Sequence, residues 1–178
     1  MNIAKKFDVD VLVCGGGVAG AAAGVAAARM GARTLLVEGR ESLGGLCTNG
    51  YISGIAGLVE GLCEDWLDRL VAKGAALKRP HLPVIEPEMG KMELEQMLLQ
   101  AGCRVLYGVH VADCVVVDGR IESVIAYSKS GKMEIKAKVF VDCTGDADLA
   151  FAAVVPCEVG SAEYCGLNQS VTMGFRLS

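Results

Sequence analysis

Three glycines near the start of the chain have the spacing of a dinucleotide-binding turn. Gly15, Gly17 and Gly20 follow the apolar run from Asp10 to Cys14 and open an alanine-rich stretch. In this pattern the first glycine permits a sharp turn, the second lets the backbone approach a pyrophosphate, and the third lets a helix lie tightly on a strand. The free N–H groups of the helix that begins near Val18 would then hold the phosphates without a basic side chain.

An acidic residue follows these glycines at the expected distance of roughly 20 residues. Glu38 comes directly after a second apolar run, Ala32 to Val37. A carboxylate in this place accepts hydrogen bonds from ribose hydroxyls and repels a 2′-phosphate. The pattern therefore predicts a site for the ADP half of FAD or NAD rather than NADP. The alternative is a packing turn in a Rossmann-like domain that binds no nucleotide.

Length and charge restrict the possible functions. With 178 residues the chain has the size of one ordinary domain and is short for a complete two-domain enzyme. The net charge is −4 and the basic residues are scattered, so nothing indicates binding to nucleic acid or an anionic membrane. The apolar run 18–28 is too short to span a bilayer. We expect a cytoplasmic protein without a membrane segment.

The cysteine pattern argues against a metal centre. The chain has eight cysteines and two histidines but no CxxC pair, so we expect neither a zinc site nor an iron–sulfur site. Four of the cysteines lie in or beside apolar runs, where cysteine behaves as a small buried hydrophobe; these are Cys14, Cys103, Cys114 and Cys143. Free thiols of this kind fit a reducing compartment.

Apolar periodicity predicts the remaining elements. Helical spacing covers 60–73, where Trp66 is expected in the core, and 91–101, which ends at Gly102; a proline-rich irregular connection, 78–87, lies between them. A short strand is expected at 104–107. Three further strands, 111–117, 120–128 and 132–137, are joined by glycine turns and form an antiparallel meander before a parallel strand at 139–143.

Three motifs together resemble the N-terminal part of the FAD-dependent oxidoreductase family, which has the glutathione-reductase-like FAD-binding fold and is related to succinate dehydrogenase/fumarate reductase flavoproteins. They are DVLVCGGGVAGAAAGVAAARMGARTLLVEGR from Asp10, ESLGGLCTNG from Glu41 and VFVDCTGDADLA from Val139. The resemblance implies an α/β fold: a Rossmann-like FAD-binding domain of three layers (β/β/α) with a parallel sheet and a three-stranded antiparallel meander. This FAD-binding domain would cover residues 1–160, and 161–178 would begin a truncated substrate domain.

The resemblance also implies a set of FAD-binding residues from separate segments of the chain. They are Gly15, Gly17, Val18, Ala19, Gly20, Glu38, Gly39, Arg40, Gly44, Gly45, Leu46, Val111, Thr144, Gly145 and Asp146. Within this set, Arg40 would lie by the adenosine, the Gly44-Gly45 doublet would pass close to the phosphate and ribityl groups, and the backbone of Val111 would meet the adenine edge. Asp146 is equally compatible with the N-cap of a following helix.

No catalytic residue is assigned. Cys47 follows the glycine doublet, but the next cysteine, Cys63, lies outside the CxxxxC spacing of disulfide reductases, which argues against dithiol chemistry. His81 and His110 belong to no motif and are expected to be surface or satisfied histidines.

The resemblance implies the FAD-binding part of a flavin-dependent oxidoreductase that passes a hydride or electrons between an unknown small-molecule substrate and the flavin. The alternatives are a non-catalytic FAD-binding subunit of an electron-transfer complex, an NAD-dependent dehydrogenase, and a sulfur-transfer or thiazole-forming enzyme. We expect Ser170 to Leu177 to be the first strand of the substrate domain. Its edge would offer a partner chain, or a second copy, a place to pair, and the chain would be incomplete as an enzyme.

Overall fold

The central strand β1 (Lys5–Cys14) pairs in parallel with a neighbour on each side. The computed structural model describes residues 3, 5–57, 59–168, 170–171 and 174. Within them a six-stranded sheet has the order β5-β2-β1-β8-β7-β6. Its other strands are β2 (Thr34–Glu38), β5 (Arg104–Tyr107), β6 (His110–Val117), β7 (Arg120–Ser128) and β8 (Gly131–Asp142).

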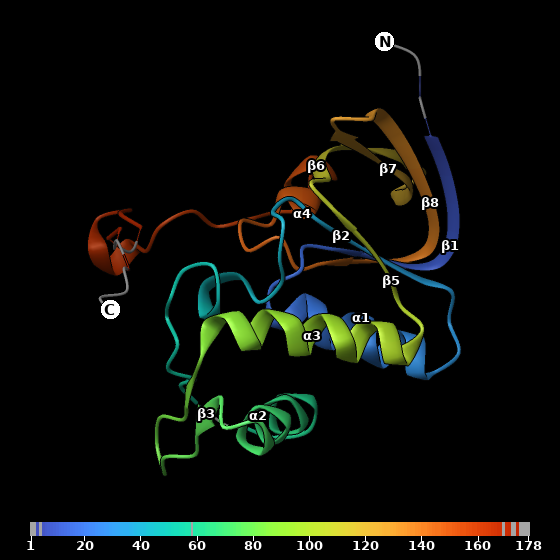
Figure 1. The fold of residues 1–178 in the computed structure, drawn as a ribbon. Coiled ribbons are helices and arrows are strands. Elements are labelled where there is room, and N and C mark those ends of the chain that lie inside the picture. Colours follow the sequence, from blue (N-terminus) through green and yellow to red (C-terminus); the bar gives the residue numbers. More distant parts are fainter. Residues whose placement is uncertain (1–2, 4, 58, 169, 172–173, 175–178) are drawn as a thin grey trace.

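Strand alternation divides the apolar residues between two cores. Successive side chains of a strand point to opposite faces, so Val13 and Leu36 pack against the helices while Leu12 and Leu35 pack against the meander. Figure 1 shows the helices α1 and α3 on one side of β1 and β2, and the strands β6 and β7 on the other side. The three layers are those expected from the sequence, and the fold is the Rossmann-like β/β/α arrangement.

Strand β8 corrects the prediction of two separate strands, 132–137 and 139–143. It is continuous: its first part pairs antiparallel with β7, from Gly131 to Lys136, and residues 133–142 pair in parallel with β1. Lys138, the residue between the two predicted strands, is exposed and forms an ion pair with Asp10 at 2.8 Å. One strand therefore belongs to both the meander and the parallel sheet.

The helices α1, α2 and α3 pack on one another, and α3 begins earlier than the sequence predicts. Helix α1 (Val18–Arg29) packs closely on α3 (Pro87–Ala101), since a Cβ at Gly24 would lie 2.7 Å from Leu98. Helix α2 (Leu62–Ala72) buries Trp66, as predicted, with 1% of its surface exposed. Helix α3 starts earlier than predicted because Glu86 accepts the Met89 N–H as N-cap and proline occupies the first turn.

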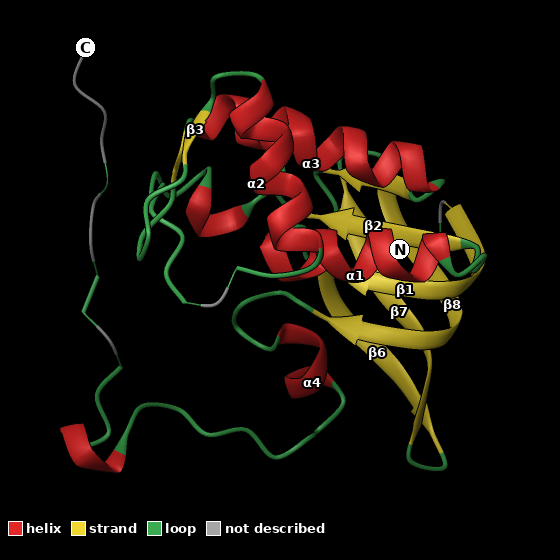
Figure 2. Ribbon diagram, turned by 90° about the horizontal axis from the view of Figure 1, so that it is seen from below, coloured by secondary structure: helices red, strands yellow, loops and turns green. Residues whose placement is uncertain are grey.

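Two further segments matter for the site. The connection expected to be irregular, 78–87, contains strand β4 (Val84–Ile85), which pairs with β3 (Ala76–Leu77) just before it to form a short hairpin. The short helix α4 (Asp148–Ala152) follows β8, and beyond it the chain leaves the body of the molecule and carries the one-turn helix η2 (Ala162–Tyr164) (Figure 2). The strand expected at 170–177 falls largely outside the described residues, and the domain division at residue 160 stays a prediction.

A methyl group at residue 20 should destabilise the fold. A Cβ there would lie far inside van der Waals contact with the carbonyl oxygen of Gly15, which is backbone and cannot move aside. We expect Gly20→Ala to lower the free energy of unfolding, measured by urea denaturation, by at least about 1 kcal/mol. Ala26→Ser, on the exposed side of the same helix, should change it by less than about 0.5 kcal/mol. Equal stability of both variants would contradict the close packing.

Candidate functional site

The glycine turn between β1 and α1 is built from contacts that exclude side chains. Gly15 has a φ of +97°, and a Cβ on it would overlap the backbone of Cys143 at the end of β8. Its N–H donates to the carbonyl oxygen of Val37 at 2.8 Å, which ties the turn to β2. The turn is therefore fixed by the strands on both sides of β1.

Gly17 differs from its neighbours because the space beside it is open. Among the described residues, no atom lies within 4 Å of the position that a Cβ would take. Gly17 is also the N-cap of α1, and no described side chain caps this helix end. Helix α1 thus presents uncapped backbone N–H groups, at Val18, Ala19 and Gly20, and the positive end of its dipole beside an open surface.

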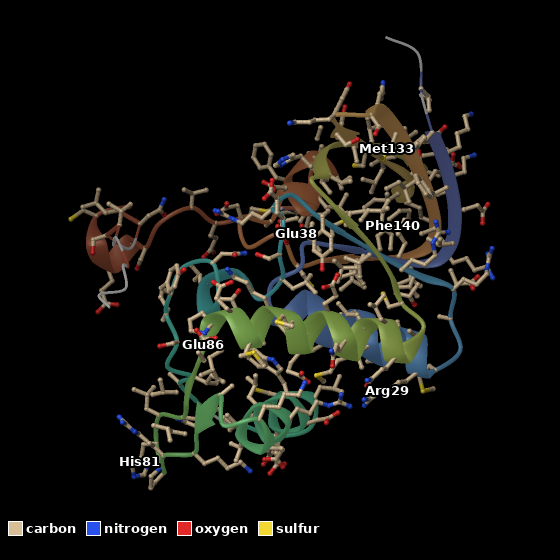
Figure 3. The ribbon with its side chains drawn as sticks, viewed as in Figure 1. Arg29, Glu38, His81, Glu86, Met133 and Phe140 are labelled. Carbon is tan, nitrogen blue, oxygen red and sulfur yellow. The ribbon has the colours of Figure 1, made fainter. Side chains whose placement is uncertain are left out.

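The Glu38 carboxylate is held at the same end of the sheet. Its Oε2 accepts the Gly16 N–H at 2.6 Å, and its Oε1 accepts the Arg40 N–H at 2.7 Å. Figure 3 shows Glu38 at the end of β2, between α3 and the meander side of the molecule. The carboxylate therefore links the glycine turn to the loop after β2.

A cleft of about 410 Å³ lies over this edge of the sheet. Ten residues line it: Gly15, Val37, Glu38, Gly39, Arg40, Val109, His110, Val111, Thr144 and Asp148. Six of them belong to the cofactor-binding set predicted from the sequence. The carboxyl ends of parallel strands, next to a helix N-terminus, are where open α/β sheets bind ligands.

The glycine doublet lies directly across the first turn. Gly44 pairs with Gly17 in an isolated parallel bridge, and its N–H donates to the Gly16 carbonyl oxygen at 2.8 Å. A Cβ on Gly45 would lie 3.2 Å from the Cα of Gly17. Leu46, in the one-turn helix η1 (Gly45–Cys47), is 71% exposed. These residues extend the open surface beyond Gly17.

The turn after β8 is organised by a residue that the sequence did not single out. The Asp142 carboxylate accepts the N–H and the Oγ1 hydroxyl of Thr144 at 3.0 and 2.8 Å, and the Ala150 N–H at 2.9 Å. Burial raises the pKa of Asp142, but these hydrogen bonds outweigh it and hold the pKa below its ordinary value. Thr144 Oγ1 in turn accepts the Asp148 N–H at 2.8 Å.

Asp146 does not have the place in the structure that the sequence predicted for it. Ala147, with a φ of 58°, is the N-cap of α4, so the N-cap role suggested for Asp146 is wrong. Asp146 and Gly145 are exposed and do not line the cleft. Asp148 lines it instead, because the tight turn at 144–147 moves the first helical residue to the rim.

His110 is exposed, in line with the expected surface histidine, and its place in the cleft was not foreseen. It lines the cleft, and its ring lies against Gly39, where a Cβ would be 2.8 Å from Nδ1. The available signal was its position directly before Val111, the residue expected at the adenine edge. His81, by contrast, is exposed on the β3–β4 hairpin, far from Glu38 in Figure 3.

The cysteines are free thiols in the part of the chain that the structure describes. Burial raises the pKa of Cys14 to about 12 and that of Cys103 to about 11. Burial also raises the pKa of Cys47, and the neighbouring Cys63 adds to the effect. A thiol that stays protonated is a poor nucleophile, so the geometry gives no support to redox chemistry at Cys47.

Comparison with known proteins decides the family. The sequence model of FAD-dependent oxidoreductases matches residues 10–178. The chain belongs to the FAD-dependent oxidoreductase family. The cofactor of this family is FAD, which confirms the cofactor predicted from the sequence. The glycine turn, the open surface at Gly17 and the acid at Glu38 fit this cofactor.

Relatives of this chain include thiamine thiazole synthase of Methanococcus aeolicus, which is 29% identical over 156 residues. The match covers 82% of this chain and 58% of the relative. The chain thus spans somewhat more than half the length of that relative. Among solved structures, a geranylgeranyl bacteriochlorophyll reductase-like protein from Thermoplasma acidophilum matches with a TM-score of 0.68, 18% identity, and coverage of 84% of this chain and 42% of that protein. THI4 of Thermovibrio ammonificans matches with a TM-score of 0.63 and 23% identity, and the match covers 82% of this chain and 61% of that protein. At these identities the structural likeness shows the fold.

Two features are absent from the described residues of this FAD-dependent oxidoreductase chain. No group of three or more histidine, cysteine or acidic side chains there is arranged to hold a metal ion. No helix there combines the length and the apolar character needed to cross a membrane.

The hydrogen bonds of Asp142 predict a pH-dependent stability. Because its pKa is lowered in the folded state, its contribution is present above the unfolded value of about 3.9 and is lost as the pH falls through the lower folded value. We expect Asp142→Asn to cost about 1 kcal/mol at pH 7 in urea denaturation, and the difference from the unmodified chain to shrink below about pH 4. Asp146→Asn, in the same turn, should show neither effect.

Proposed function

We propose that this chain is the FAD-binding part of a flavin-dependent oxidoreductase that transfers a hydride or electrons between a small-molecule substrate and FAD. Bound FAD supplies the redox chemistry, and the protein supplies binding and orientation. The observation that carries the proposal is the open surface at Gly17, directly below the uncapped N-terminus of α1. An anion at this place needs no basic side chain.

Each part of the cofactor has corresponding residues in the proposal. The backbone of 15–20 would hold the pyrophosphate, and Glu38 the adenosine ribose. Gly39, Arg40 and Val111 line the cleft on the adenosine side. The ribityl chain would continue toward the flavin ring past the doublet Gly44-Gly45, which pairs with Gly17, and past Leu46.

Two other roles follow from the same cofactor site. A non-catalytic FAD-binding subunit would hold the cofactor in the same way, and would differ by needing a partner chain for flavin reduction. Pairing of a partner or a second copy through residues 170–177 stays a prediction. Membership of the FAD-dependent family favours FAD over the NAD of a dehydrogenase.

The second candidate is a thiazole-forming activity, because a thiamine thiazole synthase is 29% identical over 82% of this chain. Mass spectrometry of the ligand released from the purified chain separates the two. Recovered FAD supports the oxidoreductase, whereas a recovered thiazole compound supports the alternative.

Gly17→Ala tests the pyrophosphate site without disturbing the fold. The φ of Gly17 is −62°, which alanine adopts freely, and the space for its methyl group is open. The methyl group would keep the phosphates from the backbone N–H groups. We expect the same free energy of unfolding as for the unmodified chain, and an FAD affinity lower by about 10- to 100-fold, the size of a lost charge-assisted hydrogen bond.

Flavin absorbance after gel filtration and quenching of Trp66 emission by added FAD measure this affinity. Ala26→Ser is the control on the same helix. Unchanged FAD affinity in Gly17→Ala would mean that the turn does not face a pyrophosphate, and saturable binding of NAD with no response to FAD would reject the cofactor assignment for this chain.

Glu38→Gln tests the ribose contact. The glutamine amide keeps one acceptor oxygen. Its NH2 group is a donor, however, and would face one of the two backbone N–H groups, of Gly16 or Arg40, that donate to the carboxylate at 2.6 and 2.7 Å. We expect the affinities for ADP and FAD to fall by the same factor, about tenfold, because both ligands contain the adenosine ribose. Calorimetric titration measures both. A loss for FAD with unchanged ADP binding would place Glu38 elsewhere along the cofactor.

A further inference from the structure

A second hollow lies at the open end of the core between the meander and the parallel sheet. Its volume is about 660 Å³, within the range of small-molecule sites. Four parts of the chain enclose it: the start of β1, the loop after β2, the connection from β5 to β6, and the hairpin of β7 and β8. Figure 3 shows Met133, which lines this hollow, on the meander, beyond Glu38 as seen from α3.

The floor of the hollow is apolar and already formed. Leu106, Val109 and Met133 line it, and all three pack in the core that joins the meander to the sheet. Val109 and Met133 are buried. The Val109 N–H donates to the carbonyl oxygen of Glu38 at 3.0 Å, which ties the floor to the loop after β2. An apolar body could therefore rest here without rearrangement of the fold.

Two tyrosines add aromatic surface to the wall. The Tyr107 hydroxyl donates to Glu95 Oε1 at 3.1 Å, so its ring has a fixed place. Tyr127 is paired directly with His110 across β6 and β7, and directly opposite side chains of an antiparallel pair project to the same face. Rings that are held in this way offer contact area to a flat apolar ligand at a small entropic cost.

The charged groups of the wall favour an anion. Lys5 and Lys129 line the hollow, whereas Glu41 is the one carboxylate among the described residues that line it. Both lysines are exposed, and neither forms an ion pair within the described part of the chain. Strand alternation puts Lys5 on the same face as Phe7, which packs in the meander core. Two ammonium groups without a carboxylate partner thus lie beside an apolar floor.

The hollow adjoins the nucleotide cleft but has its own charged groups. Gly39, Val109 and His110 belong to both walls, whereas Lys5 and Lys129 belong to the hollow alone. The His110 ring lies against Gly39, where a Cβ would be 2.8 Å from Nδ1. A ligand in the hollow would therefore be bound by groups that the cofactor does not use.

We propose that this hollow binds a small organic anion that has an apolar or aromatic body and one carboxylate group. The body would rest on the apolar floor beside the tyrosine rings, and Lys5 and Lys129 would bind the carboxylate. Glu41 in the same wall disfavours a second negative charge on the ligand. The site goes beyond the proposed function, because it takes a second ligand and does not require bound FAD.

Three probes that share a phenyl ring and differ in charge test the hollow: benzoate, benzyl alcohol and benzylamine. Each is titrated at low salt into the full ¹⁵N-labelled chain, with and without FAD, and amide shifts are followed by NMR. We expect saturable shifts at 106–110 and 127–130 with benzoate, and binding of benzylamine weaker by about tenfold. Absence of shifts in these segments, or equal binding of benzoate and benzylamine, would overturn the proposal.

Variants locate the probe and its charge preference. Lys129→Gln should weaken benzoate about two- to fivefold and leave benzyl alcohol unchanged. Lys136→Gln removes an exposed lysine of β8 that is outside the wall and should change neither; an equal effect of both variants contradicts a specific contact. Tyr127→Ala should weaken benzoate and benzyl alcohol alike, with amide dispersion as the check of folding. Unchanged binding in this folded variant would place the probe elsewhere.

Failure of this proposal and failure of the proposed function are distinguishable in the same spectra. FAD should shift the amides of 15–20 whether or not a probe is bound. FAD shifts without benzoate shifts reject the hollow alone, whereas benzoate shifts without FAD shifts reject the cofactor site and leave the hollow.

Discussion

The rest of the structure depends on one backbone contact, the approach of the Gly15 carbonyl oxygen to the Cα of Gly20. This contact leaves no room for a side chain at residue 20, and it brings the first turn of α1 down onto the end of β1. Gly15 meets the backbone of Cys143 on its other side, so β8 is fixed by the same turn. The N-terminus of α1, the end of β2 and the turn after β8 therefore converge on one edge of the sheet, where the cleft lies.

The two cores explain why this edge is rigid. Because the side chains of β1 and β2 alternate between the helix layer and the meander layer, the parallel sheet is buried on both faces. Strand β8 adds a covalent link between the layers, since it pairs with β1 in the sheet and with β7 in the meander. A shift of the meander relative to the sheet would have to break one of these ladders.

The parts of this fold that follow from local rules were predictable from the sequence. The glycine spacing, the acid at Glu38, the core position of Trp66 and the meander all depend on residues close together in the chain or on simple periodicity. The early start of α3 was missed because glutamate is an uncommon N-cap. The continuity of β8 was missed because Lys138, a polar residue between two apolar runs, resembles a strand boundary, and its partner Asp10 is distant in sequence.

The site was predictable to the same degree and for the same reason. Its glycines and Glu38 have a recognisable spacing, whereas His110, Asp142 and Asp148 acquire their places through the meander and the turn after β8. Nothing in the local sequence distinguishes Asp142 from Asp146, because the difference lies in which carboxylate the turn directs toward the N–H groups of Thr144 and Ala150. Side chains that act through a tertiary turn need the structure to be found.

The geometry of Glu38 explains how an acidic chain can hold an anionic cofactor. Both of its oxygens accept a backbone N–H, yet each keeps acceptor capacity for a sugar hydroxyl. The phosphates would then meet N–H groups and a helix dipole instead of lysine or arginine side chains. A net charge of −4 is therefore compatible with binding FAD, because recognition at the proposed site would depend on backbone groups whose position the glycine turn fixes.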